Sequence, residues 1–254
     1  KKYFTSINTP FKYNEDYIYE KIGNTALIKA QFIVDNFSSK KSIDSRELDF
    51  CKDMRNALYP KGKFKLIKPS TLNSVVDFID RHIKTNAGII TYNYDDLLER
   101  GLEEQGKYSY DTIYSDRIIE HKNVSIYHVH GYLPRNGHVL SEHSKSVILS
   151  EYKYNYLFNN PLSWQVSCQL TRFRENICLL IGLSISDPSL RRILEYVKQS
   201  NTNAIHYAIF SKNSKCGVSN LNDIVAVNKH FERMGIRILW VDDYSYIPTL
   251  IDSI

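Results

Sequence analysis

Short, almost uniformly apolar runs alternate with helix-like segments along the last two thirds of the chain. The apolar runs lie at residues 87–90, 124–127, 177–181, 204–210 and 236–241. Segments with the spacing of amphipathic helices lie at residues 95–105, 161–174, 189–199 and 222–233. Strands that are apolar on both sides need cover on both faces of their sheet, and strands that alternate with helices are typical of parallel sheets. The sequence therefore predicts an α/β fold with a mostly parallel sheet and helices on both faces.

The first third of the chain has helical spacing and no strand-like run. It predicts helices at residues 25–37, 45–58 and 72–83. Residues 1–22 show no clear period, so we expect them to be mostly irregular. The N-terminal third is therefore expected to be rich in helix.

We expect one domain over residues 1–254, made of a helical part at 1–85 and an α/β core at 86–254. At 254 residues the chain is long enough for a full hydrophobic core. It begins with Lys1 and not with Met, so we expect it to be a fragment of a longer multidomain protein.

Charge and cysteine spacing argue against several classes of function. The net charge of +5 is spread along the chain, so direct nucleic-acid binding is not expected. No apolar run approaches the roughly 20 residues that span a bilayer, and no signal peptide is visible, so membrane association is not expected. The four cysteines share no paired spacing, so we expect no bound metal. Without a secretion signal, we expect reduced cysteines and a cytoplasmic location.

Three polar clusters follow three of the apolar runs, at the points where the predicted strands end. They are Thr91–Asp96, His128–Gly131 and Gly182–Pro188. In open α/β sheets, ligands bind outside the carboxyl ends of the strands. We therefore expect an amide, an imidazole and a glycine-serine turn to converge on one ligand.

Each cluster also has an interpretation without a ligand. Asn93 or Asp95 can cap the helix that begins near Asp96, and Gly182–Asp187 can be a simple loop before a helix that opens at Pro188.

A histidine after a strand is often only a packed or surface residue. Of the two histidines in the second cluster, we prefer His130 as a base, because His128 should point to the opposite face of the strand and Gly131 allows close approach of a ligand.

The order of the three clusters resembles the sirtuin family. Sirtuins carry a TxNxD-type motif, then His-Gly, then Gly-x-Ser, which here are Thr91–Asp95, His130-Gly131 and Gly182–Ser184. The resemblance implies a Rossmann-like fold and NAD⁺ as the substrate. It also implies roles for single residues: Asn93 would position the nicotinamide ribose and the attacking water, and His130 would be the general base. The residues implied to bind NAD⁺ are Thr91, Asp95, Gly182, Leu183 and Ser184.

Two departures from the family narrow the resemblance. The opening strand with a Gly-Ala-Gly phosphate turn is not found in this sequence. The four-cysteine zinc module of deacetylases is also missing, since only Cys168 and Cys178 lie between the His-Gly and Gly-x-Ser motifs. A tyrosine-rich stretch, 152–158, stands there instead. In this the chain is similar to the sirtuin-like effector domains of bacterial anti-phage defence proteins, which hydrolyse NAD⁺.

This narrower resemblance implies an enzyme that cleaves the nicotinamide–ribose bond to give nicotinamide and ADP-ribose, and so depletes NAD⁺ during abortive infection. The alternatives are an NAD-dependent protein deacylase or ADP-ribosyltransferase, or a catalytically silent module that binds NAD⁺ or ADP-ribose. Expected partners are further copies of the chain and a regulatory or phage-derived activator that acts through regions outside it. The stretch 152–158 is a candidate interface between copies, although its tyrosines can equally line the core or the substrate cleft.

Overall fold

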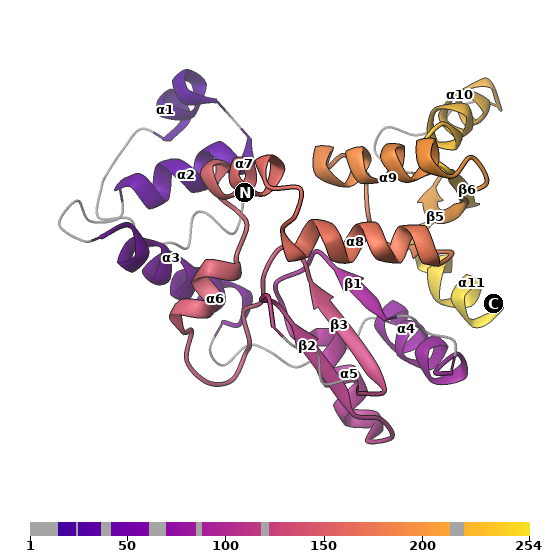
Figure 1. Ribbon diagram of the computed structural model, residues 1–254, viewed down its shortest axis with the longest axis horizontal. Coiled ribbons are helices and arrows are strands. Elements are labelled where there is room, and N and C mark those ends of the chain that lie inside the picture. Colours follow the sequence, from indigo (N-terminus) through magenta and orange to yellow (C-terminus); the bar gives the residue numbers. More distant parts are fainter. Residues whose placement is uncertain are drawn as a thin grey trace. The chain divides into compact units, whose positions relative to one another are not determined.

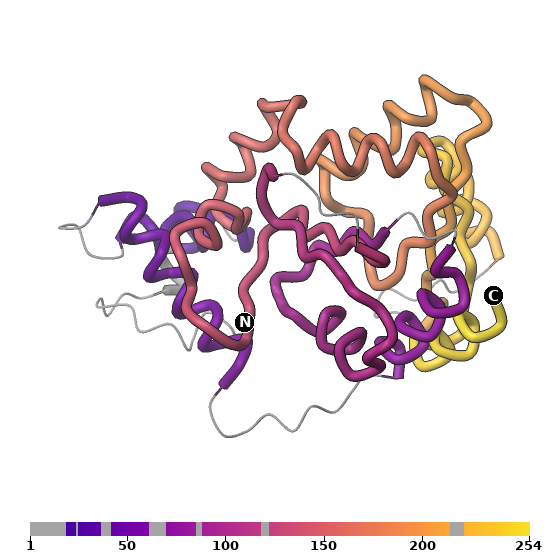
Figure 2. Tube along the Cα trace, turned by 60° about the horizontal axis from the view of Figure 1, so that its bottom comes forward, coloured from indigo at the N-terminus to yellow at the C-terminus, as the bar shows by residue number. Residues whose placement is uncertain are grey.

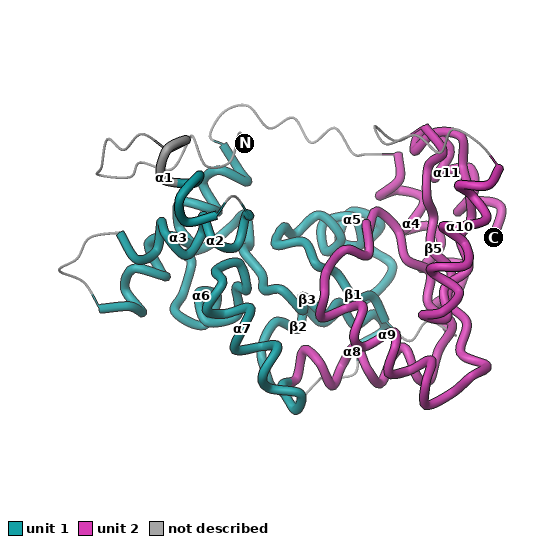
Figure 3. Tube along the Cα trace, turned by 90° about the horizontal axis from the view of Figure 1, so that it is seen from above, with its two compact units in different colours: residues 1–67, 88–163 teal, residues 68–87, 164–254 magenta. Residues whose placement is uncertain are grey.

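A computed structural model describes residues 15–23, 25–36, 42–60, 70–84, 88–117, 122–213 and 221–254 of the chain (Figure 1). Helices lie on both sides of parallel sheets, which confirms the predicted α/β class. The chain divides into two compact units, each built from segments that are distant in sequence (Figure 3). The first unit comprises residues 1–67 and 88–163, and the second comprises 68–87 and 164–254. The single domain expected from the sequence stays a prediction.

The first unit contains a parallel sheet in the order β1-β3-β2. Its strands are β1 (Ile89–Thr91), β2 (Tyr110–Ile113) and β3 (Val124–His128). The central strand β3 is almost wholly buried, and its bounds are the ones that its apolar run predicted. The edge strand β2 was not predicted, because Tyr110–Ile113 alternates between half-buried and buried residues and has no apolar run.

Six helices are described in the first unit. They are α1 (Glu15–Ile22), α2 (Ala26–Asn36), α3 (Ile43–Leu58), α5 (Leu97–Gln105), α6 (Ser141–Ser146) and α7 (Glu151–Asn159). The helices α2 and α3 confirm the helical first third. In the segment 1–22, which was expected to be mostly irregular, residues 15–22 are helical, and residues 1–14 lie outside the described residues. Helix α5 ends at Gly106, which has the left-handed conformation that suits glycine. The buried faces of α2 and α3 pack on each other through Ala30, Ile33 and Phe50.

The second unit contains another parallel sheet, in the order β4-β5-β6. Its strands are β4 (Leu179–Leu180), β5 (His206–Ser211) and β6 (Ile236–Val241), and its helices are α4 (Ser70–Arg81), α8 (Trp164–Glu175), α9 (Pro188–Ser200), α10 (Leu221–Glu232), η1 (Tyr244–Tyr246) and α11 (Ile247–Asp252). Helix α4 lies beside α11, where Arg81 donates to the carbonyl of Ile251 at 2.9 Å (Figures 1 and 2). Helix α4, which precedes β1 in the sequence, thus packs against the last helix of the chain and completes the core there.

Two predicted boundaries in this unit were wrong. The strand expected at 177–181 is only Leu179–Leu180, because Ile177 is 75% exposed and cannot be a core position. The helix expected to start at Pro161 starts at Trp164, and Pro161 lies in a turn before it. Among the described residues, no helix has the length and apolar character needed to cross a membrane.

The interior of the second unit contains a histidine that is kept neutral. His206, at the start of β5, is 2% exposed, and its Nδ1 accepts the main-chain N–H of Cys178 at 3.3 Å. Its Nε2 has no hydrogen-bond partner among the described residues, and the Phe173 ring stands edge-on at 5.1 Å. Burial, and then the charge of Lys198, lower the pKa of His206 from 6.5 to about 4.

Acid should therefore destabilise the protein through His206. In the unfolded chain this imidazole takes up a proton near pH 6.5, but in the folded protein only near pH 4, so stability is complete above pH 6.5 and falls as the pH drops toward 4. The loss should reach at most about 3 kcal/mol. In urea unfolding, the free energy of unfolding of a His206→Gln variant should fall less between pH 6.5 and 4 than that of the unaltered protein. Removing the exposed His138 in the same way should keep the original slope, and equal slopes for all three proteins would contradict the assignment.

Candidate functional site

The carboxyl ends of β1 and β3 lie next to each other in the first unit. The strands pair in register, with Thr91 opposite His128, and the N–H of Val129 donates to the carbonyl of Thr91 at 3.2 Å. Asn93 and His130 each lie two residues beyond this last pair. The predicted amide and the predicted imidazole therefore occupy neighbouring loops at one edge of one sheet.

The main chain of Asn93 is held on both sides. Its N–H donates to Thr91 Oγ1 at 3.1 Å, and its carbonyl accepts from His128 Nδ1 at 3.1 Å. Thr91 is 8% exposed, whereas the Asn93 side chain is exposed. The loop thus presents an amide to solvent on a main chain that is fixed from inside.

Asp95 begins the turn into α5, and its Oδ1 accepts the N–H of Leu97 at 3.2 Å. The N-cap position of α5 is Asp96, whose side chain makes no capping hydrogen bond, so Asp95 supports the turn one residue before the cap. Burial raises the pKa of the Asp95 carboxyl, against the effects of the Leu97 hydrogen bond and of the nearby His128. The next residue, Asp96, is buried. Its Oδ2 accepts a hydrogen bond from the N–H of Arg135 at 2.9 Å, and its own N–H donates to the Tyr59 hydroxyl, also at 2.9 Å. These contacts fix the start of the helix.

His130 lies in a tight turn directly after β3. The N–H of Gly131 donates to the carbonyl of His128 at 3.0 Å, and the carbonyl of His130 accepts from Ile148 at 2.8 Å. The ring is half-buried and packs against the Tyr92 ring, perpendicular to it at 4.9 Å between centroids. His128, by contrast, is fully buried. The preference for His130 as the solvent-facing histidine therefore agrees with burial.

A buried carboxylate next to His128 was missed from the sequence. Glu99, in the first turn of α5, is 3% exposed, and its Oε1 lies 2.8 Å from His128 Nε2. A glutamate in an amphipathic helix is normally expected to face solvent. The available signal was His128 itself, since a histidine on the buried side of a strand needs a polar partner.

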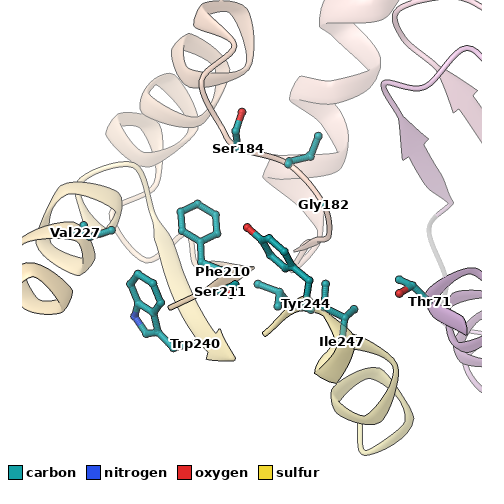
Figure 4. A pocket seen from close by; sticks show the side chains of 11 residues that line it. Thr71, Gly182, Ser184, Phe210, Ser211, Val227, Trp240, Tyr244 and Ile247 are labelled. Atoms are coloured by element: carbon teal, nitrogen blue, oxygen red, sulfur yellow. The ribbon is translucent and has the colours of Figure 1, made fainter. Parts of the chain in front are cut away.

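The third predicted cluster belongs to the second unit, where it lines a pocket of about 640 Å³ (Figure 4). The pocket lies at the carboxyl ends of β4, β5 and β6, and three aromatic side chains, Phe210, Trp240 and Tyr244, contribute to its wall. The residues that line it are Thr71, Gly182, Leu183, Ser184, Ile209, Phe210, Ser211, Val227, Trp240, Tyr244 and Ile247. Aromatic rings form part of its wall, and Ser184 and Ser211 add hydroxyl groups to it.

The turn from β4 into α9 is both a loop and part of this pocket. Gly182 has φ +69°, and a Cβ built there would meet no atom within 4 Å, so the main chain faces open space. Ser184 and Ser186 are linked through their hydroxyl oxygens at 2.7 Å. Asp187 Oδ1 accepts from Leu190 N–H at 3.0 Å, and Pro188 occupies the first turn of the helix. The predicted start of the helix at Pro188 is confirmed, and Asp187 is its cap.

Within the ranges that the structure describes, no group of three or more His, Cys, Asp or Glu side chains is arranged to hold a metal ion. Three cysteines in those ranges, Cys51, Cys168 and Cys178, are free. The segment between His130 and Gly182 folds into the helices α6, α7 and α8.

Comparison with known families gives one match. The family described as SIR2-like domain matches residues 87–239, which is more than half of the chain. The match includes all three polar clusters and the strands that precede them. A search of curated proteins found no match.

Proposed function

Because the chain belongs to the SIR2-like domain family, whose members act on NAD⁺, we propose that it hydrolyses NAD⁺ at the nicotinamide–ribose bond. Water adds to C1′ of the ribose and nicotinamide leaves with the bonding electrons, so the products are nicotinamide and ADP-ribose. The proton of the attacking water passes to a base and then to solvent.

The observation that carries this proposal is the adjacency of Asn93 and His130 at the ends of two paired strands. Nicotinamide is a cationic leaving group, so its departure needs no strong acid, and the barrier lies in an oxocarbenium-like ribose centre. An imidazole that deprotonates water or a ribose hydroxyl suits this step, and so does an amide that orients the water. Both are present, and the main chain of both is fixed by hydrogen bonds.

The remaining predicted residues would bind the substrate. Taken by itself, the pocket of the second unit suits an adenine ring against its aromatic wall, with a ribose or phosphate against the main chain at Gly182 and the hydroxyl of Ser184. Leu183 would line the same pocket. In the first unit, Asp95 would help to bind NAD⁺. Thr91 would contribute indirectly, because its hydroxyl accepts the N–H of Asn93 and so holds the Asn93 loop.

Hydrolysis is favoured over deacylation because of the segment between the His-Gly and Gly-x-Ser motifs. The zinc-module cysteines of deacetylases are missing from the sequence there, and three helices occupy the segment.

We further propose that the activity serves anti-phage defence, as an effector that depletes cytoplasmic NAD⁺ in abortive infection. Such an activity must be gated, because free hydrolysis would kill the host. Assembly of several copies is a suitable gate: Tyr152 and Tyr156 on α7 are 66% and 65% exposed, and aromatic residues are enriched at interfaces. A regulatory or phage-derived activator would act through regions outside this chain.

The test is to incubate the purified protein with NAD⁺ over a range of protein concentrations, with and without an acylated peptide, and to measure nicotinamide and ADP-ribose by chromatography. The proposal expects equimolar products without the peptide, and a specific rate that rises with protein concentration if assembly is the gate. Nicotinamide release only with the peptide would support the deacylase or transferase instead. Binding of ADP-ribose without any turnover would support the silent module.

A further inference from the structure

A buried glutamate and a buried histidine lie directly beneath the Asn93 loop. His128, the last residue of β3, is fully buried, and Glu99 on α5 is 3% exposed. Nε2 of His128 lies 2.8 Å from Glu99 Oε1, and its Nδ1 lies 3.1 Å from the carbonyl oxygen of Asn93. The histidine therefore bridges the glutamate and the main chain of the proposed water-orienting residue.

The chemistry of these contacts fixes the direction of the hydrogen bonds. The carbonyl oxygen of Asn93 can only accept, so His128 Nδ1 must carry a proton and donate it. A second proton must lie between Nε2 and Glu99 Oε1, on one atom or the other, because both atoms could otherwise only accept. In either arrangement, Glu99 selects the ring form in which Nδ1 donates to Asn93.

This pair is poorly suited to a purely stabilising role. Glu99 Oε1 also accepts from Thr112 Oγ1 at 3.1 Å, but the buried Oε2 has no hydrogen-bond partner among the described residues. Buried pairs of this kind are often no more stabilising than apolar residues of the same volume, and an unsatisfied carboxylate oxygen adds a further cost. Costly local arrangements are expected where function requires them.

We propose that Glu99 and His128 form a positioning pair that fixes the Asn93 main chain for catalysis. The proposal rests on the proposed role of Asn93 in NAD⁺ hydrolysis. Thr91 holds the N–H of Asn93 and His128 holds its carbonyl, so the peptide groups on both sides of the residue are fixed. Glu99 acts on Asn93 only through His128. The Tyr132 ring packs against the His128 ring, with 4.6 Å between the ring centroids. Neither member of the pair touches the reacting atoms.

The decisive variant is the double substitution Glu99→Leu/His128→Phe. It replaces the pair with apolar side chains of similar volume, so the unit should fold with a Tm close to that of the unaltered protein. It removes the hydrogen bond to Asn93, and displacement of a catalytic group by about 1 Å can cost roughly 10²-fold in rate. We expect kcat for nicotinamide release to fall at least about 10-fold while KM changes less than about 3-fold. An unchanged kcat in the folded double variant would overturn the proposal.

Two single variants separate charge from contact. Glu99→Gln keeps a polar partner for His128 Nε2, because its amide N–H can donate to that nitrogen while Nδ1 keeps its proton. It should therefore retain more activity than Glu99→Ala, which leaves Nε2 unpaired. Equal losses in both would overturn the positioning role of Glu99. The matched control is His143→Phe. His143 is also a buried histidine of the first unit and stacks on Tyr114, but it makes no contact with Asn93 that the structure describes. It should leave kcat unchanged once stability is allowed for.

A measurement that does not need turnover keeps this proposal distinct from the proposed function. The amide of Tyr94 belongs to the same peptide group as the Asn93 carbonyl, so its ¹⁵N chemical shift reports the hydrogen bond from His128. In the double variant this shift should change and the backbone order parameter of Asn93 should fall, with no change in His143→Phe. If the unaltered protein releases no nicotinamide, the proposed function fails, while the ¹⁵N result still decides whether the pair fixes Asn93. An unchanged Tyr94 shift would overturn the pairing itself.

Discussion

Replacing His130 with alanine should lower the rate of nicotinamide release by about 10²–10⁴-fold, the usual contribution of a general base. The imidazole follows β3 in a turn whose main-chain hydrogen bonds, from Gly131 and Ile148, do not involve the side chain. The edge contact with Tyr92 is lost, at a cost of no more than about 1.5 kcal/mol. The folded structure should therefore persist while the activity disappears.

Asn93→Ala should have a comparable effect, because the amide side chain is exposed and its loss leaves the hydrogen bonds of the loop main chain in place. Initial rates of nicotinamide release should be measured together with Tm for each variant. His138→Ala, which removes an exposed histidine from the same unit, is the control and should be fully active. A well-folded His130→Ala protein with full turnover would remove the histidine from the mechanism.

The parts of this fold that could be predicted are those in which one physical requirement dominates. The strand Val124–His128 is buried along its length, so an apolar run marked it with its correct bounds. Helix α9 begins with Asp187 as its cap and Pro188 in its first turn, and this pair of residues is typical of the start of a helix. The edge strand β2 and the shortened β4 were not predicted, because edge strands need no continuous apolar run and because Ile177 is apolar yet exposed.

The candidate site follows the same rule. The loop residues Asn93 and His130 were visible because the carboxyl ends of parallel strands share an edge, and the structure places both residues just beyond the ends of two paired strands. The role of Glu99 was not visible in the sequence, because its partner His128 is 29 residues away and only the packing of α5 against the sheet brings the two together. Buried polar pairs of this kind depend on tertiary geometry, which periodicity does not encode.

Gly131→Ala should be among the most destabilising single substitutions in the first unit. Gly131 has φ +106°, and a Cβ built on it would lie 2.5 Å from Val147 Cα and 2.7 Å from both Ser146 O and Val147 N. All three atoms belong to the main chain, so no side chain can move to make room. Strain from the positive φ, about 1–2 kcal/mol, would add to an overpacking cost of about 1–3 kcal/mol.

Gly137→Ala provides the matched control, because Gly137 also has a positive φ, +82°, but a Cβ there would meet no atom within 4 Å. Urea unfolding should show that Gly131→Ala costs about 1–3 kcal/mol more than Gly137→Ala, the difference being the clash alone. Since the carbonyl of the neighbouring His130 accepts from Ile148, we expect the same clash to displace the turn that carries His130. Nicotinamide release should therefore fall in Gly131→Ala even at temperatures at which the protein is fully folded, and remain normal in Gly137→Ala. Equal stability in the two variants would show that the turn after β3 does not approach residues 146–147 closely, and would leave His130 without the support that positions it.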